Sequence, residues 1–467
     1  MNKTISNKLD VNVEVAVIGG GQAGLAAGYY LKLATIPFVI IDSNNRIGDS
    51  WRKRWDSLEL FTPRPFAGLP GLKISTKYDY YPKKDEIAKY FETYVDKFKL
   101  PIMSGLNVSN VTKNKSTFVI ETAQQTIFAQ SIIISTGPYT SAFIPEFAEK
   151  LDKDVYQIHS SQYKNPKQIM GDTVTIVGGG NSAMQLTEEL FASGKSVTLI
   201  FSKMPWFLPK TLFGISSYWW FYLTGILHSD ANSPISKYVR RKGDGIIGLT
   251  AKKLIKNGSV DHRVSRVADA KPKSLILANK KRIPVSSIVW ATGFKPNYDW
   301  LNLVGSLGDK GEPVQVKGIS PVAGVYWIGL PWQSKMNSGI INGVSSDARL
   351  IVKRIKLIKT KTKGTKNMEE IRSKMLKGDA ILLDVRTEAE WNEEHALGAI
   401  HIPIDQIESD YKLKLNPDLP IYIYCGSGKR AGVAKTFLDE SGYSSINIGG
   451  LSDWKKAGGK TVKGIGL

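Results

Sequence analysis

Two glycine-rich turns, each between an apolar strand and a helical stretch, restrict the folds open to this chain of 467 residues. The first turn follows the strand 13–18 and reads Gly-Gly-Gly-Gln-Ala-Gly over residues 19–24. In this context Gly19 permits the tight turn, Gly21 lets a pyrophosphate approach the backbone, and Gly24 lets helix and strand pack closely. The pattern predicts a dinucleotide-binding turn at a helix N-terminus. The alternative is a glycine-rich turn that closes a plain βα unit.

The next apolar strand ends at Asp42, where an acid can accept hydrogen bonds from a ribose diol. The pattern then returns after the strand 173–177. This second turn reads Gly-Gly-Gly-Asn-Ser-Ala, so that Gly178, Gly180 and Ala183 take the places of the three spaced glycines. A second dinucleotide site is therefore predicted.

The strand after the second turn, 196–201, leads to Lys203 instead of an acid. A cation at this place suits a 2′-phosphate, which favours NADPH over NADH. The alternative for Lys203 is an ordinary surface lysine in a lysine-rich chain. The contrast between Asp42 and Lys203 predicts FAD at the first turn and NADPH at the second.

Three more strand ends indicate that one nucleotide domain interrupts the other. Strands 132–137 and 288–293 both end in Thr-Gly, the latter at Gly293, and they bracket the second turn. A third strand, 325–329, ends at Gly329 and leads through a glycine-containing stretch to a helix, whose start could point N–H groups at a flavin. We predict an α/β protein with a FAD-binding domain in two parts, 11–168 and 286–352, and an inserted NADPH-binding domain, 169–285.

The positive charge of the chain lies ahead of its last hundred residues. Residues 369–467 hold 13 basic and 15 acidic side chains, whereas residues 1–368 hold 50 and 27. Between them, residues 353–366 contain seven Lys or Arg and no acid. We interpret residues 353–368 as a basic linker with a helix running into it; the alternative is an anchor to an anionic surface. The tail 369–467 is then a separate domain.

A series of motifs follows in a fixed order between residues 11 and 352: GGGQAG (19–24), GDSWRKRWDSLELFTPRPFAGLP (48–70), YYPKKDEIAKYFETYVDKF (80–98), HSSQY (159–163), GGGNSA (178–183), WATGF (290–294) and GLPWQSKMNSGIINGVSSDA (329–348). Together they resemble the flavin-containing monooxygenase superfamily, especially its bacterial and plant indole-pyruvate branch. The resemblance implies that NADPH reduces FAD, that the reduced flavin takes O2 to a C4a-hydroperoxide, and that one oxygen passes to a small N-, S- or carbonyl-containing substrate. Disulfide reductases share the layout but need a cysteine beside the flavin, and the only cysteine here is Cys425.

Two residues of these motifs have more than one interpretation. Trp51 follows the first ribose-binding acid at the point where the chain would pass over the isoalloxazine; the alternative is loop packing. His159 is either a hydrogen-bonded core histidine or a nucleotide contact.

An aromatic stretch at residues 204–227 follows the second turn, and residues 203–256 hold nine basic side chains against two acids. Aromatic residues flanked by cations are typical of an interfacial membrane helix. The alternative, which we favour, is a helical lid over the substrate channel. No motif that reads RNA or DNA accompanies the charge, so nucleic acid is not predicted as a partner.

The single cysteine ends a buried strand, 421–425, and the turn GSGKR and a helix follow it. Glycine-rich backbone, a helix N-terminus and adjacent cations all stabilise a thiolate, so that Cys425 is a candidate catalytic residue. The alternative is a buried, inert cysteine.

Residues 369–467 resemble the rhodanese family through DVR (384–386), EEHALGAIHIP (393–403), CGSGKR (425–430) and GGLSDW (449–454). The loop has the six-residue length of sulfurtransferases. The resemblance implies a small α/β domain in which Cys425 carries a persulfide and Arg430 helps to hold an anionic sulfane-sulfur donor. Asp384 and Arg386 are expected to be structural.

The polar residues 1–10 lead directly into a strand, and no apolar run reaches the roughly 18 residues of a spanning helix, so we expect no signal peptide and no transmembrane segment. One cysteine suits a reducing cytosol and excludes a thiolate metal cluster. We expect a cytoplasmic enzyme with no metal site, with peripheral membrane contact left open. The predicted function is FAD- and NADPH-dependent monooxygenation with a fused sulfurtransferase domain. The alternatives are NADPH-dependent oxidoreduction of sulfur compounds coupled to sulfur transfer, and a rhodanese part that only docks or senses.

Overall fold

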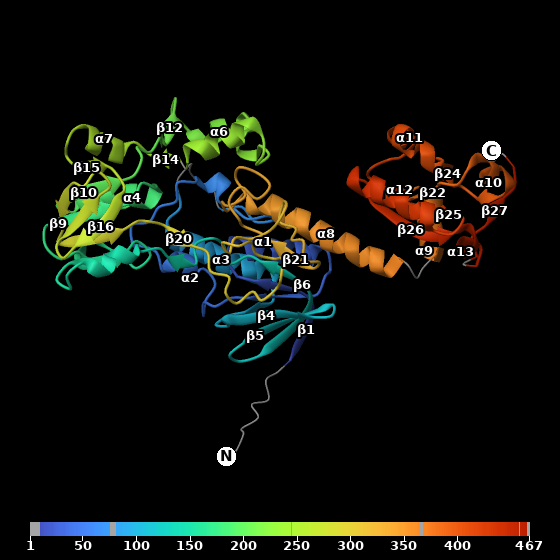
Figure 1. Ribbon diagram of the computed structural model, residues 1–467, viewed down its shortest axis with the longest axis horizontal. Helices are drawn as coiled ribbons and strands as arrows, with labels where there is room; N and C mark the ends of the chain where they lie inside the picture. Colours follow the sequence, from blue (N-terminus) through green and yellow to red (C-terminus); the bar gives the residue numbers. More distant parts are fainter. Residues whose placement is uncertain (1–9, 75–80, 244, 365–367, 457, 465–467) are drawn as a thin grey trace, which may run out of the picture. The chain divides into compact units, whose positions relative to one another are not determined.

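The computed structural model describes residues 10–74, 81–243, 245–364, 368–456 and 458–464, which form two compact units. The division falls between Val352 and Lys353, and helix α8 (Val344–Gly364) runs across it. The predicted linker 353–368 is therefore helical as far as Gly364, and its residues 365–367 lie outside the described parts, as do residues 1–9 at the N-terminus (Figure 1). Among the described helices, none is long and apolar enough to cross a membrane.

The first sheet of the first unit is built on strand β1 (Val11–Ile18). Parallel neighbours of β1 are β2 (Phe38–Ile41) and β6 (Thr126–Ile134). Its other strands are β3 (Ile102–Met103), β4 (Val108–Asn114), β5 (Thr117–Thr122) and β21 (Val325–Trp327). The central strands are runs of Val and Ile, which suit a parallel sheet buried on both faces. Helix α1 (Gln22–Leu33) connects β1 to β2 and completes a βαβ unit.

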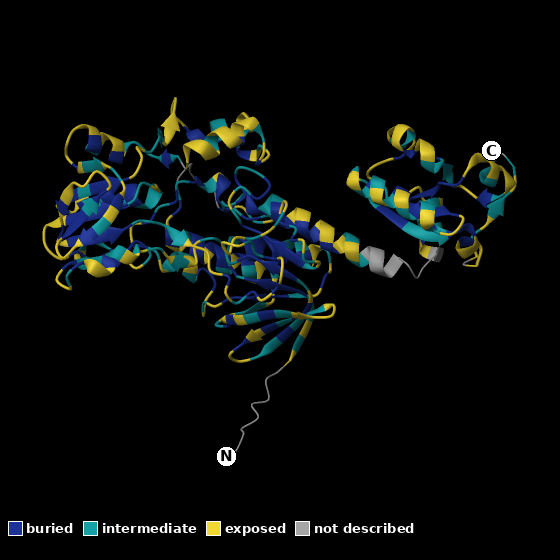
Figure 2. Cartoon of the chain, in the orientation of Figure 1, coloured by how far each residue is buried: buried dark blue, intermediate teal, exposed yellow. Residues whose placement is uncertain are grey.

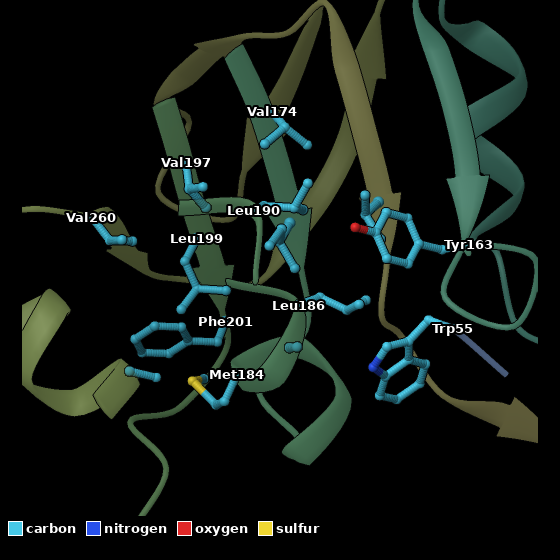
Figure 3. Packing of buried hydrophobic residues seen from close by; sticks show 14 of the residues in the cluster. Trp55, Tyr163, Val174, Met184, Leu186, Leu190, Val197, Leu199, Phe201 and Val260 are labelled. Atoms are coloured by element: carbon cyan, nitrogen blue, oxygen red, sulfur yellow. The ribbon is translucent and has the colours of Figure 1, made fainter. Parts of the chain in front are cut away.

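The second sheet is parallel throughout, in the order β15-β10-β9-β19-β8. Its strands are β8 (Tyr156–His159), β9 (Thr173–Val177), β10 (Ser196–Phe201), β15 (Asp261–Val264) and β19 (Ser287–Trp290). Helix α4 (Asn181–Ala192) connects β9 to β10, and Figure 3 shows its Leu186 and Leu190 packed among Val174, Val197 and Leu199 of the sheet.

The pairing of β8 and β19 differs from the predicted domain boundaries. The sequence predicts an inserted domain at 169–285, and both of these strands lie outside it. Trp290 of β19 pairs with Val177 of β9 and with His159 of β8, so both strands belong to the second sheet. The predicted boundary is wrong because a strand that ends in Thr-Gly does not reveal which sheet it joins.

The aromatic stretch 204–227 is not one helix. It contains β11 (Phe207–Leu208), a hairpin of β12 (Thr211–Leu212) and β13 (Ile215–Ser216), helix α5 (Ser217–Leu223) and a 3-10 turn, η4 (Ile226–His228). Positive φ angles at Phe213, Gly214 and Gly225 break the helical pattern. The predictions of a helical lid and of a membrane helix are therefore both wrong in their secondary structure.

The other helices of the first unit are α2 (Asp49–Arg52), α3 (Lys84–Phe98), α6 (Pro234–Lys242) and α7 (Thr250–Lys256). A three-stranded antiparallel meander follows β15 in the chain and precedes β19. Its strands are β16 (Val267–Lys271), β17 (Ser274–Leu277) and β18 (Arg282–Pro284). Short pairs join β7 (Ser141–Ala142) to β20 (Phe294–Lys295) and β11 to β14 (Ile246–Ile247).

The second unit has a four-stranded parallel sheet in the order β24-β22-β25-β26. The strands are β22 (Ile381–Asp384), β24 (Ile400–His401), β25 (Ile421–Cys425) and β26 (Ser445–Gly450). The helices are α9 (Met368–Leu376), α10 (Glu388–Glu393), α11 (Ile407–Lys414), α12 (Lys429–Glu440) and α13 (Leu451–Lys456). Alternate residues of β25 join two different apolar clusters, as expected for a strand covered on both faces. The predicted α/β fold class is confirmed for both units.

Candidate functional site

The first glycine turn is fixed sterically at two of its three spaced glycines, Gly19 and Gly24. Gly19 has a φ of +109°, and a Cβ there would lie 2.7 Å from the Ser135 carbonyl oxygen. A Cβ on Gly24 would overlap the Gly19 carbonyl oxygen, so the start of α1 packs directly on the strand end. A Cβ on Gly21 would meet nothing within 4 Å, and no side chain caps the helix there. Gly21 thus leaves the uncapped N–H groups of α1 open to an anionic ligand.

Asp42 lies immediately after β2 and is 9% exposed. Its Oδ2 accepts a hydrogen bond from the Gly20 N–H at 2.5 Å, and its Oδ1 accepts one from the Asn44 N–H at 2.7 Å. The carboxylate therefore holds the end of β2 against the first turn. Oδ1 also accepts from the Asn44 side-chain amide at 3.0 Å, whereas Oδ2 keeps a further lone pair, so Asp42 can still accept from a ribose hydroxyl through Oδ2.

The chain returns to this turn after β21. Gly329 has a φ of +90°, and a Cβ there would lie 2.8 Å from the Ala23 Cβ at the start of α1. Further along, the Ser345 hydroxyl lies 3.0 Å from the Tyr30 hydroxyl of α1. Residues 329–345 thus contact α1 at both Ala23 and Tyr30.

This return segment and the start of α8 carry buried polar atoms that the described residues leave without a hydrogen bond: Oδ1 of Asn337, Oδ1 of Asn342 and Oδ2 of Asp347. Asp347 is fully buried, and its burial raises the pKa of its carboxyl group. Such atoms need a polar ligand or water. Together with the open face at Gly21, they fit a bound FAD.

The second turn repeats the first with one change. Gly178 has a φ of +151°, and a Cβ there would overlap the Ala291 carbonyl oxygen, whereas a Cβ on Gly180 would meet nothing within 4 Å. The third position holds Ala183, which is fully buried. Lys203 is exposed, and its carbonyl oxygen lies 3.9 Å from where a Cβ on the middle glycine, Gly179, would stand. The second turn therefore leaves the uncapped N-terminus of α4 open at Gly180, as Gly21 does for α1 at the first turn.

A cavity of about 350 Å³ flanks α4 next to the second turn. Asn181, Gln185 and Glu188 line it from one face of the helix. Residues 209–211 and 246–253, which include Lys210 and Lys253, line its other side and form the covering segment. The Asn181 side chain bonds to the Gly245 carbonyl and the Ile247 N–H and so holds this segment in place. Burial raises the pKa of the Glu188 carboxyl group, which accepts a hydrogen bond from the Ala251 N–H.

His159 is a buried, fully bonded histidine. Its Nδ1 accepts from the Ser161 N–H at 3.1 Å, so the proton lies on Nε2, which donates to the Gly293 carbonyl oxygen at 3.0 Å. Burial lowers the pKa of the ring and the nearby Arg54 lowers it further, so the ring is neutral at pH 7. Of the two interpretations of His159, the structure favours the core histidine, which fixes the positive-φ position of Gly293 (φ +83°).

Trp51 and Arg54 lie on the segment that crosses between the two sheets. The Trp51 ring is half-buried and packs against the core of the second sheet. The Arg54 guanidinium lies 5.3 Å from the centre of the Phe294 ring, and burial lowers its pKa. No carboxylate among the described residues pairs with Arg54. Sequence reasoning missed Arg54, because nothing in WRKRW distinguishes it from its charged neighbours.

In the second unit, Cys425 ends β25 and is 1% exposed. Its Sγ accepts a hydrogen bond from the Gly428 N–H at 3.1 Å. Burial alone would raise the pKa of the thiol, but hydrogen bonds from the N–H groups of Ala431, Ser427, Gly428 and Arg430 outweigh it, so that the net pKa is lowered. The loop thus stabilises a thiolate.

The Arg430 side chain is half-buried and is held by an acidic partner. Its guanidinium forms a two-bond ion pair with Glu390 of α10, at 2.6 and 2.7 Å. The Arg430 hydrogen bonds hold the pKa of Glu390 at about 2. Sequence reasoning missed Glu390, because its partner is 40 residues away and no local signal links them. By contrast, Asp384 and Arg386 form a buried ion pair at 2.7 Å, as expected for a structural role.

Comparison with known proteins places these sites in families. Residues 16–219 match the pyridine nucleotide-disulphide oxidoreductase model, and residues 367–457 match the rhodanese-like domain. The chain is 39% identical to an uncharacterized CzcO-like oxidoreductase of Geobacillus kaustophilus over 340 residues, which cover 73% of this chain and 97% of that protein. A solved flavin-containing monooxygenase of Stenotrophomonas maltophilia matches 74% of this chain and 98% of its own, with a TM-score of 0.63 and 26% identity. The chain belongs to the flavin-containing monooxygenase superfamily.

Two further proteins are similar over much of the chain. A probable indole-3-pyruvate monooxygenase of Arabidopsis thaliana, YUCCA7, is 25% identical over 71% of this chain and 85% of that protein. The bacillithiol disulfide reductase of Staphylococcus aureus, at 17% identity and a TM-score of 0.56, shares the fold alone. This flavin-containing monooxygenase homologue is thus a flavin-dependent oxidoreductase with a C-terminal rhodanese-like domain, which confirms both predicted resemblances.

Proposed function

We propose that the first unit is a monooxygenase that binds FAD at Gly19, Gly21, Gly24 and Asp42 and NADPH at Gly178, Gly180 and Lys203. The observation that carries the proposal is the pair of turns, which are sterically closed at Gly19 and Gly178 and open at Gly21 and Gly180. Bound FAD would take electrons from NADPH and activate O2, with one oxygen passing to a small N-, S- or carbonyl-containing substrate and the other leaving as water. The protein's residues orient the two cofactors and exclude water from the space between them.

The experiment compares Gly21→Val with Gly180→Val in the full-length protein. Both changes put a side chain into open space, so both variants should fold. We expect Gly21→Val to purify without flavin absorbance, and Gly180→Val to keep the flavin but lose its reduction by NADPH. Wild-type protein is then screened for NADPH and O2 consumption across amines, thioethers, persulfides and keto acids. Loss of flavin from both variants, or from neither, would contradict the assignment.

For the second unit we propose that Cys425 accepts a sulfane sulfur. The Cys425 thiolate attacks the outer sulfur of a donor such as thiosulfate, a new S–S bond forms, and sulfite leaves with the electron pair of the bond that breaks. Transfer of the persulfide sulfur to cyanide gives thiocyanate and restores the thiolate. The lowered thiol pKa supports this step. Cys425→Ser should abolish thiocyanate formation, and an inactive wild type would favour a docking or sensing role.

The thiolate also supports a second candidate, in which the flavin unit reduces or oxidises the sulfur compounds that Cys425 delivers or receives. Stopped-flow absorbance after mixing the reduced protein with O2 separates the two. A transient C4a-hydroperoxide spectrum favours monooxygenation, and its absence favours sulfur oxidoreduction. If Cys425→Ser leaves NADPH turnover of every sulfur substrate unchanged, the two units are not coupled.

A further inference from the structure

An apolar finger projects from the first unit. It consists of residues 211–216, the hairpin of β12 and β13, and it stands out beside α6 (Figure 1). Phe213 at its tip is 83% exposed, and Leu212 and Ile215 on its two strands are exposed as well. Leu223 of the adjoining α5 is 72% exposed. Large apolar side chains concentrated in this way cost free energy in water unless something covers them.

The tip is held in an unusual conformation. Phe213 has a φ of +51°, in the left-handed region that side chains other than glycine, asparagine and aspartate rarely adopt. The Trp220 Nε1–H of α5 donates to the Leu212 carbonyl oxygen at 3.2 Å, and the Phe213 and Trp220 rings meet edge to face with centres 6.3 Å apart. These contacts fix a bulky aromatic side chain outward at a position where a glycine would be unstrained, which points to a function for the ring.

The base of the finger is anchored in the unit. Ser216 and Ser217 are buried, and the Ser217 hydroxyl donates to the Pro209 carbonyl oxygen at 2.6 Å. Tyr218 packs with Phe66 and Leu227 in an apolar cluster. The finger is therefore a fixed projection of the folded unit.

Positive charge is concentrated on α6, which follows the finger in the chain after α5 and η4. Helix α6 exposes Lys237, Arg240, Arg241 and Lys242, and Figure 2 shows the helix and the finger largely exposed. Asp230, the acid just before α6, is paired with Lys317 at 3.1 Å. The Ser229 and Ser236 hydroxyls lie 2.8 Å apart and tie the start of α6 to the end of the preceding turn.

We propose that the finger and α6 together dock on an anionic phospholipid bilayer. Exposed aromatic and aliphatic side chains next to Lys and Arg suit the interface of such a bilayer. The apolar side chains enter the headgroup region, while the cations contact the lipid phosphates. A second copy of the chain fits less well. An isologous contact between two such faces would bring the cations of one α6 near those of the other. The proposal is independent of the enzymatic one.

The test is co-sedimentation of the full-length protein with vesicles of phosphatidylcholine, alone or mixed with phosphatidylglycerol. We expect at least about tenfold more binding to the acidic vesicles, and a loss of that excess at high salt. Phe213→Ser combined with Leu223→Ser should reduce binding about tenfold or more. Lys237→Glu combined with Arg241→Glu should remove the preference for acidic vesicles.

Matched controls separate this surface from general effects. Val304 is fully exposed elsewhere in the same unit, so Val304→Ser should bind as the wild type does. Lys73→Glu combined with Lys153→Glu makes the same charge change at two exposed lysines that belong to neither the finger nor α6. Flavin content, measured in each variant, checks the fold without depending on membrane binding. Equal binding to neutral and acidic vesicles, equal losses in finger and control variants, or a dimer that Phe213→Ser dissolves would each overturn the proposal.

Discussion

The two glycine turns of the first unit share a backbone design but differ at the positions that set tightness and charge. At the first turn Gly24 brings the helix into contact with the Gly19 carbonyl, and Asp42 closes the turn through the Gly20 N–H. At the second turn Ala183 takes the tight position, and the exposed Lys203 follows the second strand. The first turn is therefore packed into the core of its domain, whereas the second leaves its charged residue exposed, where a ligand can reach it.

Exchanging the residue types at Gly24 and Ala183, the third spaced position of each turn, should produce the largest difference in unfolding free energy. In Gly24→Ala the new Cβ overlaps a backbone oxygen, so strand or helix must shift, and we expect a loss of roughly 3 kcal/mol of unfolding free energy or more, together with loss of flavin. In Ala183→Gly the cost is about 1 kcal/mol, from helix propensity. Urea unfolding and flavin content measure both. Similar losses in the two variants would mean that the turns are equally tight.

The charged positions should separate stability from cofactor choice. Asp42→Ala leaves the Gly20 N–H without its acceptor, which costs about 1–3 kcal/mol, and it weakens FAD binding. Lys203→Ala changes an exposed side chain, so its stability should stay within about 0.5 kcal/mol of the wild type.

The effect of Lys203→Ala should appear in the choice of nicotinamide cofactor instead. Loss of one charged hydrogen bond to a 2′-phosphate should lower kcat/KM for NADPH about tenfold and leave the value for NADH unchanged. Steady-state kinetics with both cofactors measure this ratio. An equal fall with NADPH and NADH would show that Lys203 does not read the 2′-phosphate.

Features that depend on contiguous residues could be predicted from the sequence. Strand, glycine spacing and helix are contiguous, so both turns and the Cys425 loop could be placed from the amino-acid sequence alone. Partners distant in the chain could not be. The Arg430–Glu390 pair, the Asp42–Gly20 bond and the assignment of β8 and β19 to the second sheet all depend on which segments meet in space. The aromatic stretch misled because its composition suits a helix, while Gly214 and Gly225 turn the chain.

His159 offers the smallest effect and tests how rigidly the strand ends near the second turn are held. Its ring is neutral and buried in the folded protein, with its pKa lowered first by burial and then by Arg54. The unfolded chain binds a proton near pH 6.5, and the folded chain does so only at lower pH. The stabilising contribution of the neutral ring is therefore full above pH 6.5 and is lost as the pH falls through that value.

His159→Gln can keep a donor to the Gly293 carbonyl oxygen but has no proton to bind. We expect wild type and variant to differ by less than about 1 kcal/mol at pH 8, and the wild type alone to carry this added loss between pH 7 and 5. Urea unfolding of both proteins across this pH range measures the difference, in which the carboxyl groups common to both cancel. Parallel curves would show that His159 is protonated as readily in the folded protein as in the unfolded chain, and that the Gly293 turn yields to accommodate the charge.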